Sequence, residues 1–213
     1  YAGSQCKWGT KSTEYGTVFV DDVTGKIFLL GEGLKELSLK GMRNWFEENI
    51  QINLNNQYKK IKGIDYPYNN QPALKNGIGF FTAYDPRHKR IIITKKDYEC
   101  LNINRFNDLE IMNVEDKTTF KDLSWTISYS FLQDSWVSWH SYLPNFYYND
   151  SNNFYSSINT IPKTYRHDKY NFQTYYGVKK PYIIEYVLNK DSQITKTLDD
   201  VSYLSKVEEL DID

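Results

Sequence analysis

The sequence SWTISYSF at Ser124–Phe131 is followed by the polar segment LQD at 132–134 and then by SWVSWHSY at Ser135–Tyr142. Aromatic and aliphatic side chains of the first half alternate with hydroxyl side chains, namely Trp125, Ile127 and Tyr129 with Thr126, Ser128 and Ser130. Successive side chains of a strand point to opposite faces of a sheet. The stretch therefore predicts a β-hairpin whose first strand has one aromatic face and one hydroxyl face.

The same order, a strand, a short polar turn and a second strand, recurs elsewhere in the chain. A turn rich in Asp joins TVFV to KIFLL within 17–30, and Asp85-Pro86 begins the turn within 78–94. Two further strands are predicted at 153–157 and 164–167, and a last one at 182–188. We therefore predict a mainly β fold of antiparallel hairpins that form propeller-like blades, with a sandwich as the alternative.

One segment has the periodicity of a helix. Trp45 and Phe46 follow Met42 by three and four residues, and Ser38 is placed to cap a short helix over 38–49. The residues that follow, 51–76, are polar and contain Gly63, Pro67 and Pro72, so we expect a long polar excursion there.

The domain boundaries follow from composition. We expect one β-rich domain over 1–189, with 51–76 as its insertion, and a charged C-terminal arm over 190–213. The first residue is Tyr1, so we expect the chain to be a fragment of a longer protein. No apolar run approaches the roughly 20 residues of a membrane span, and none is predicted.

The composition is unusual in its aromatic residues, which make up 16% of the chain and include 19 tyrosines. Tyrosine favours strands and surfaces that are buried at one end and wet at the other. The formal net charge of −1 lacks the basic footprint of a nucleic-acid-binding protein. Cys6 and Cys100 have no metal-ligand spacing, and we expect free thiols.

The segment 136–142 gathers two tryptophans, one histidine and two serines. Regular alternation would place Trp136, Ser138, His140 and Tyr142 on one face, and Val137, Trp139 and Ser141 on the other. A serine nucleophile needs a base within reach and a third group that orients the base, and no nucleophile-elbow motif is present. We interpret the segment as a packed aromatic strand and predict no catalytic residue.

Metal and cofactor sites are not predicted either. His88, His140 and His167 lack the spacing of a helical metal site. Asp21, Asp22 and Gly25 supply only part of a calcium-loop pattern, and 149–153 lacks a distal acid, so both read as turns. We predict no metal ligand and no cofactor.

Four tyrosines leave two alternatives open. Tyr147 and Tyr148, with Tyr175 and Tyr176, would suit a platform on which sugars stack. They would equally suit a packing surface between subunits or blades, since aromatic residues are also enriched at interfaces.

Several segments together resemble the tail proteins of crAss-like phages. They run in order from about residue 7 to 188: Gly16–Asp21, Gly25–Leu30, Leu34–Ser38, Gly41-Met42, Trp45-Phe46, Thr82–Asp85, Arg90–Tyr98, Ser124–Tyr129 and Trp136–Pro144. The resemblance is to the tail nozzle of short-tailed phages, called the muzzle or stabilisation protein in this group. It implies a propeller-like structural protein of the virion without catalytic residues, and hence no enzyme.

The resemblance also implies partners. We expect a homo-oligomeric ring of about sixfold or higher symmetry around the DNA exit channel. The ring would contact other tail and portal-proximal proteins and other fragments of the same polyprotein chain, and genomic DNA would pass through it transiently. A carbohydrate-binding β module of a surface or secreted protein is the alternative function. A propeller glycosidase is a third, and it would need two carboxylates that the sequence does not single out.

Overall fold

The computed structural model describes residues 2–107, 113–150, 153–158, 161–167, 173–181 and 183. Its contacts divide the chain into a unit Tyr1–Lys180 and a unit Pro181–Asp213. The account below concerns the first unit. Apart from Ile183, the strand predicted at 182–188 and the arm predicted over 190–213 lie outside the described residues.

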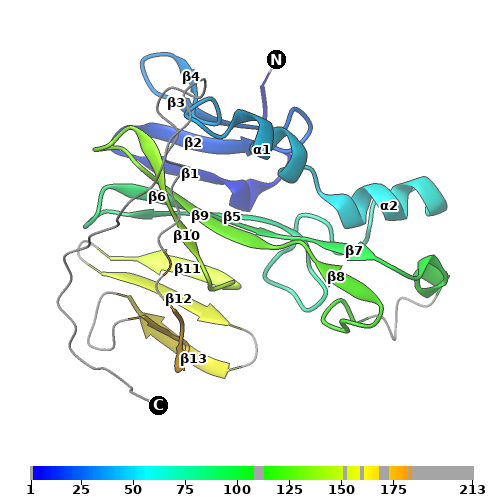
Figure 1. Ribbon diagram of the computed structural model, residues 1–213. Helices are drawn as coiled ribbons and strands as arrows, with labels where there is room; N and C mark the ends of the chain where they lie inside the picture. The colour runs from blue at the N-terminus through cyan, green and yellow to red at the C-terminus, as the bar shows by residue number, and fades with distance from the viewer. Residues whose placement is uncertain are drawn as a thin grey trace, which may run out of the picture. The chain divides into compact units, whose positions relative to one another are not determined.

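A four-stranded antiparallel sheet forms the centre of the unit (Figure 1). Its order is β10-β9-β6-β5, with β5 at Gly79–Asp85, β6 at Arg90–Lys96, β9 at Trp125–Ser130 and β10 at Ser135–His140. Every residue of β5 and β9 is buried. A strand buried along its whole length needs a covering layer on both faces of its sheet, and this sheet has two.

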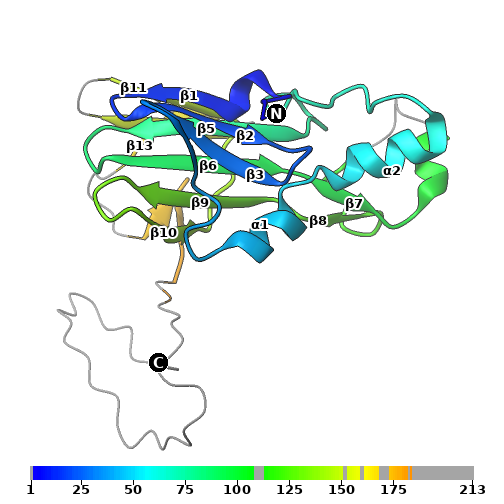
Figure 2. The same ribbon diagram turned by 90° about the horizontal axis from the view of Figure 1, so that it is seen from above.

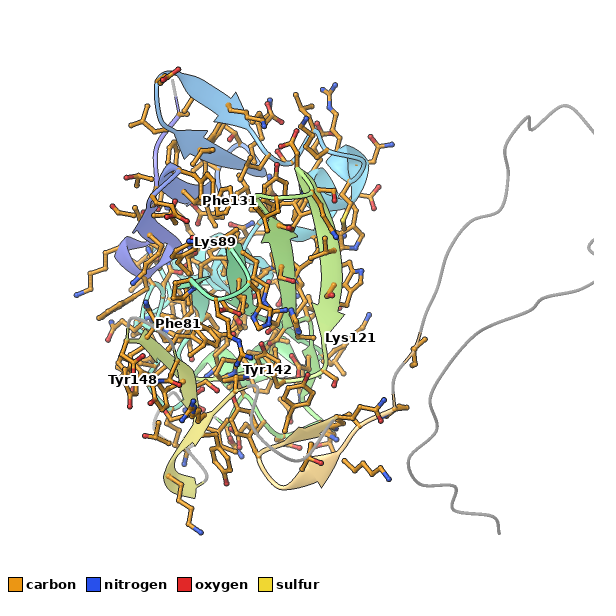
Figure 3. The ribbon with its side chains drawn as sticks, turned by 90° about the vertical axis from the view of Figure 1, so that its left-hand side faces the viewer. Phe81, Lys89, Lys121, Phe131, Tyr142 and Tyr148 are labelled. Atoms are coloured by element: carbon orange, nitrogen blue, oxygen red, sulfur yellow. The ribbon has the colours of Figure 1, made fainter. Side chains whose placement is uncertain are left out.

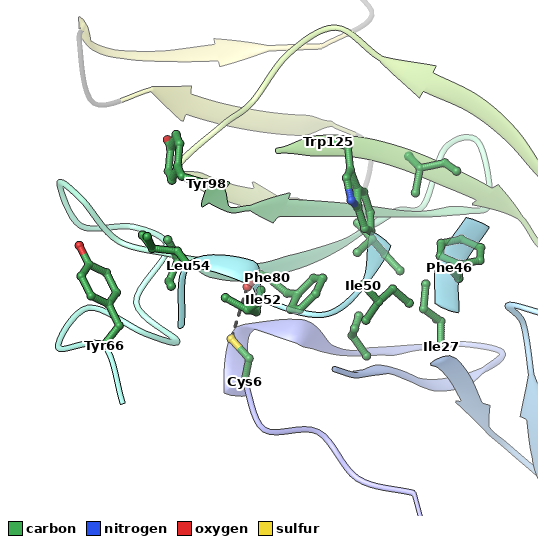
Figure 4. Packing of buried hydrophobic residues seen from close by; sticks show 14 of the residues in the cluster. Cys6, Ile27, Phe46, Ile50, Ile52, Leu54, Tyr66, Phe80, Tyr98 and Trp125 are labelled. Carbon is green, nitrogen blue, oxygen red and sulfur yellow. Dashed lines mark hydrogen bonds between the residues drawn. The ribbon is translucent and has the colours of Figure 1, made fainter. Parts of the chain in front are cut away.

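The first layer is the sheet β1-β2-β3-β4, with bounds Thr10–Thr13, Gly16–Asp21, Lys26–Leu30 and Leu34–Glu36, together with helix α1 at Arg43–Asn49. It packs on the aromatic face of the central sheet, as the close view in Figure 4 shows for Ile27, Phe46 and Trp125. The buried core there also includes Val18, Val20, Ile91, Ile93, Ile127 and Tyr129. Apolar burial of this kind is the main stabilising contribution to the fold.

The second layer is the sheet β11-β12-β13, at Phe146–Asn149, Phe154–Ile158 and Ile161–Arg166. Ala83 and Ile92 of the central sheet pack with Phe154, and Tyr147 lies against them. The hydroxyl face predicted for β9 is therefore confirmed, but it faces this layer: Thr126, Ser128 and Ser130 are all buried. Buried hydroxyls need hydrogen-bond partners, so this interface is polar.

The smaller elements lie around these layers. In Figure 2, α2, β7 and β8 gather beyond one end of the central sheet. Their bounds and those of the other short elements are Lys7–Gly9 for η1, Asn53–Lys62 for α2, Tyr98–Cys100 for β7, Ile103–Asn107 for η2, Phe120–Asp122 for β8, Thr174–Tyr175 for β14 and Val178–Lys179 for β15.

The mainly β class is confirmed. Strands pair antiparallel in all three predicted hairpins, and so do the strands predicted at 153–157 and 164–167. The propeller is not confirmed. The second and third hairpins join into one sheet, because Ile91 and Ile93 of β6 pair with Tyr129 and Ile127 of β9. In the described part of the chain, the central sheet instead lies between two other antiparallel sheets.

The helix predicted over 38–49 is shorter than expected. It begins at Arg43, and Met42 occupies the N-cap position without a side-chain cap. The Ser38 hydroxyl instead donates to Glu36 Oε1 at 2.9 Å. The predicted apolar face is correct: Phe46 is fully buried, and Met42 and Trp45 pack against the core.

A second helix, α2, occupies part of the predicted polar excursion, which is a correction to the sequence analysis. Ile52 at its N-cap position supplies no side-chain cap. The cap comes instead from Asp97, the residue after β6. Its carboxylate accepts hydrogen bonds from Asn53 N at 2.7 Å and Leu54 N at 3.1 Å. A helix start capped by a residue 44 positions away in sequence leaves no local signal to find.

The same carboxylate forms a buried ion pair with Lys95. Lys95 Nζ lies 2.8 Å from Asp97 Oδ2, and the two side chains are 3% and 0% exposed. The ammonium also donates to the carbonyls of Asn49 at 2.8 Å and Gln51 at 2.7 Å, at the end of α1. This pair therefore connects the end of α1 and the start of α2 to the central sheet.

Trp125 and Trp139 provide a test of these layers. Trp125 is 9% exposed and donates its indole N–H to Asn49 O, whereas Trp139 is 55% exposed. We expect Trp125→Ala to lower the free energy of unfolding by about 3–5 kcal/mol. Trp139→Ala should lower it by less than about 1 kcal/mol. Urea denaturation of both variants checks this, and equal losses would contradict the assigned packing.

Candidate functional site

A β-bulge at Val137 changes the predicted faces of β10. Trp136 pairs with Tyr129, but the next paired residue is Ser138, which is opposite Ser128. The extra residue shifts the alternation by one position. Trp136 and Trp139 therefore share the aromatic side, where Trp136 lies 4.7 Å from Phe46, ring centroid to centroid. The expectation that these two tryptophans lie on opposite faces is wrong.

Ser138 and His140 do share a face, but the serine that contacts His140 is another one. His140 Nε2 lies 3.0 Å from Ser128 Oγ. Burial, together with the nearby charges of Arg90 and His167, lowers the pKa of His140 to about 3, so its imidazole is neutral near pH 7. Ser128 has no exposed surface and His140 is partly buried, so the hydroxyl of this pair is not open to a substrate.

Two of the three histidines meet at one aromatic ring. The rings of His140 and His167 lie 5.1 and 5.2 Å from that of Tyr142, and His167 Nε2 contacts Ser156 Oγ at 2.7 Å. His88 lies apart from this group and pairs with Asp85, Nδ1 to Oδ2, at 2.8 Å. No group of three or more His, Cys, Asp or Glu side chains among the described residues could hold a metal ion.

The carboxylates of the two predicted turns are used as turn acceptors. Asp21 Oδ1 accepts from Thr24 N at 3.1 Å, and Asp21 Oδ2 accepts from Gly3 N at 3.2 Å. Asp150 Oδ1 accepts from Asn153 N at 2.7 Å, while 151–152 lie outside the described residues. Burial raises the pKa of Asp22, which disfavours the ionised form that a calcium ligand requires.

Both cysteines are free and buried. Cys6 Sγ lies 3.6 Å from Phe80 O, the contact that is dashed in Figure 4. Cys100 Sγ lies 3.2 Å from Asn102 O, and burial raises the pKa of its thiol. A thiol of raised pKa is a poor nucleophile, so Cys100 acts as a packing group.

The four tyrosines proposed as a platform do not form one. Tyr147 points inward, its hydroxyl 2.7 Å from Thr94 Oγ1, and the Tyr176 hydroxyl lies 2.6 Å from Ser156 Oγ. The ring of Tyr175 packs 4.7 Å from that of Tyr142. Tyr148 alone faces outward, with 44% of its surface exposed, at the margin of the molecule in Figure 3.

Tyr148 has a partner that the sequence analysis did not select. Its ring stacks on that of Tyr155 at 4.5 Å and 5°, across the β11–β12 pair. The Tyr155 hydroxyl donates to Asp150 Oδ2 at 3.3 Å, and Arg166 follows in register on β13. Tyr148, Tyr155 and Arg166 lie side by side because of the pairing register of the three strands. Their uneven spacing in the sequence gives no sign of this neighbourhood.

A second exposed aromatic group, besides the Tyr148–Tyr155 pair, lies on β10 at the edge of the central sheet. Val137 and Trp139 on β10 are 38% and 55% exposed. The ring of Trp139 meets that of Trp45 on α1 edge to face, 4.5 Å between centroids. Exposed apolar groups that lie together are typical of interaction surfaces.

Polar groups that could react and apolar groups that could bind a partner therefore lie in different places. The serines that contact histidines, Ser128 and Ser156, are fully buried, whereas Val137, Trp139 and Tyr148 are exposed. Neither helix in the described part of the chain has the length and apolarity to cross a membrane. The chain matches no protein-family model and no curated protein sequence.

The buried His140 predicts a pH dependence. Its folded pKa lies below the unfolded value, so its contribution to stability is complete above about pH 6.5 and is lost as the pH falls towards 3. His140→Gln keeps a polar group beside Ser128 but does not titrate. We expect the free energy of unfolding to fall less steeply for the variant between pH 7 and 4. Parallel curves for the two proteins would refute the assignment.

Proposed function

We propose that the chain is a structural subunit of a phage tail, part of a nozzle or muzzle ring around the DNA exit channel. The observation that carries the proposal is the exposed aromatic edge at Trp139, with Trp45 beside it, in a chain whose histidine-paired serines, Ser128 and Ser156, are fully buried. A subunit of an assembly needs complementary surfaces, whereas an enzyme of this kind needs an accessible reactive group. The sequence resemblance to crAss-like phage tail proteins supports the same role.

The proposed partners are copies of the same chain in a ring, other tail proteins and fragments of the same polyprotein chain. Genomic DNA would pass through the ring without being held. The net charge of −1 suits such a lining, because a concentrated basic surface would retain DNA through its phosphates. The virion is accordingly the proposed location.

A carbohydrate-binding module is the second candidate, and the Tyr148–Tyr155 pair favours it. The stacked rings stand on the outer face of β11 and β12, and Asp150 lies at hydrogen-bond distance from one of them. Sugar rings stack on exposed aromatic faces and need polar groups at their margin, and both kinds of group are present here.

One pair of experiments separates the two candidates. We expect the purified chain to form ring-shaped oligomers in electron micrographs, with a matching native mass, and to give no signal on a glycan array. A monomer at all concentrations would contradict the ring. Glycan binding that disappears in Tyr148→Ala but persists in Val23→Ala, an exposed residue of the β2–β3 turn, would establish the carbohydrate module instead.

A further inference from the structure

Among the residues that the structure describes, no strand pairs with the outer side of β10, which is an edge of the central sheet. It stands at one end of the sheet order, while β5 at the other end contacts β1 and β11. An edge strand presents backbone N–H and C=O groups on the side that has no neighbouring strand. The chemistry that recognises such an edge is an extended peptide, which adds to the sheet as a further strand.

The side chains along β10 indicate where the added strand would lie. The bulge at Val137 disturbs the first half of the edge, and pairing is regular again over 138–140. Bulges protect edges from unwanted pairing, so the protected half favours the second half as the receiving site. There the exposed ring of Trp139, held against Trp45, offers an apolar contact to the incoming side chains.

We propose that residues 182–188 of a second copy of this chain add to β10 as an extra strand. The segment reads YIIEYVL, in which six of seven residues are apolar or aromatic, and three are β-branched. Ile183 is 76% exposed in the single chain. Such a sequence gains stability as a strand only when a neighbour pairs with its backbone and covers its side chains.

The stoichiometry favours a second copy as the donor, and in this respect the inference rests on the proposed ring. Each chain has one such segment and offers β10 as a receiving edge. Contacts between two different surfaces run head to tail from copy to copy, and they close into a ring when the rotation allows it. The proposed contact would thus supply the ring's subunit interface.

Cross-linking between differently tagged chains tests the contact directly. A full chain with Val137→Cys is mixed with one carrying Ile184→Cys under mild oxidation, and the two native thiols are buried. We expect a disulfide between the two tags. The control replaces Val23, which is 67% exposed in the β2–β3 turn, by Cys and should not cross-link. Equal cross-linking in the control, or a disulfide that forms only within one chain, would overturn the proposal.

Charged substitutions in the full chain separate this inference from the ring itself. Ile184→Asp with Val187→Asp should abolish both cross-link and oligomers, whereas Val201→Asp with Leu204→Asp should leave them. Rings that persist in the first variant would overturn the inference and leave the ring intact. If the unsubstituted chain forms no oligomer, a peptide of residues 181–189 decides: slowed amide exchange at 138–140 supports strand addition, and unchanged exchange overturns it.

Discussion

The buried ion pair between Lys95 and Asp97 is the interaction on which the arrangement of the helices depends. Both residues come from β6 or its end, and their side chains satisfy backbone groups of two separate helices: carbonyls at the end of α1 and amides at the start of α2. Burying a charge costs several kcal/mol unless it is paired and hydrogen-bonded, so few alternative placements of the two helices would be stable. The position of α1 then places Trp45 and Phe46 over Trp125.

Coverage of the central sheet on both faces determines where polar groups can act. The aromatic face meets α1 and the β1–β4 sheet, and the hydroxyl face meets the β11–β13 sheet. The buried hydroxyl groups on that second face need hydrogen-bond partners within the protein. Thr94 with Thr126 and His140 with Ser128 are such pairs. The exposed part of β10 and the outer face of β11 and β12 then remain for contacts with other molecules.

The sequence predicts local features of this fold well and long-range ones poorly. Alternation at 124–130 correctly predicts the two faces of β9, and the polar turns correctly predict the hairpins, because both depend on neighbouring residues. The bulge at Val137 has no marker in the sequence, and one extra residue reverses the faces that follow. Helix α2 escapes prediction because its cap comes from Asp97. The Tyr148–Tyr155 stack depends on a register that no single strand encodes.

A double-mutant cycle at Lys95 and Asp97 measures how strongly this ion pair holds the two helices on the central sheet. The variants are Lys95→Met, Asp97→Asn and their combination, with Lys121→Met, 63% exposed and 3.8 Å from Glu99, as the control. We expect each single variant to lose about 3–5 kcal/mol of unfolding free energy and the combination to lose less than the sum. The amides of residues 53–54 should exchange faster. Single variants no less stable than the control, with unchanged exchange in α2, would contradict this expectation.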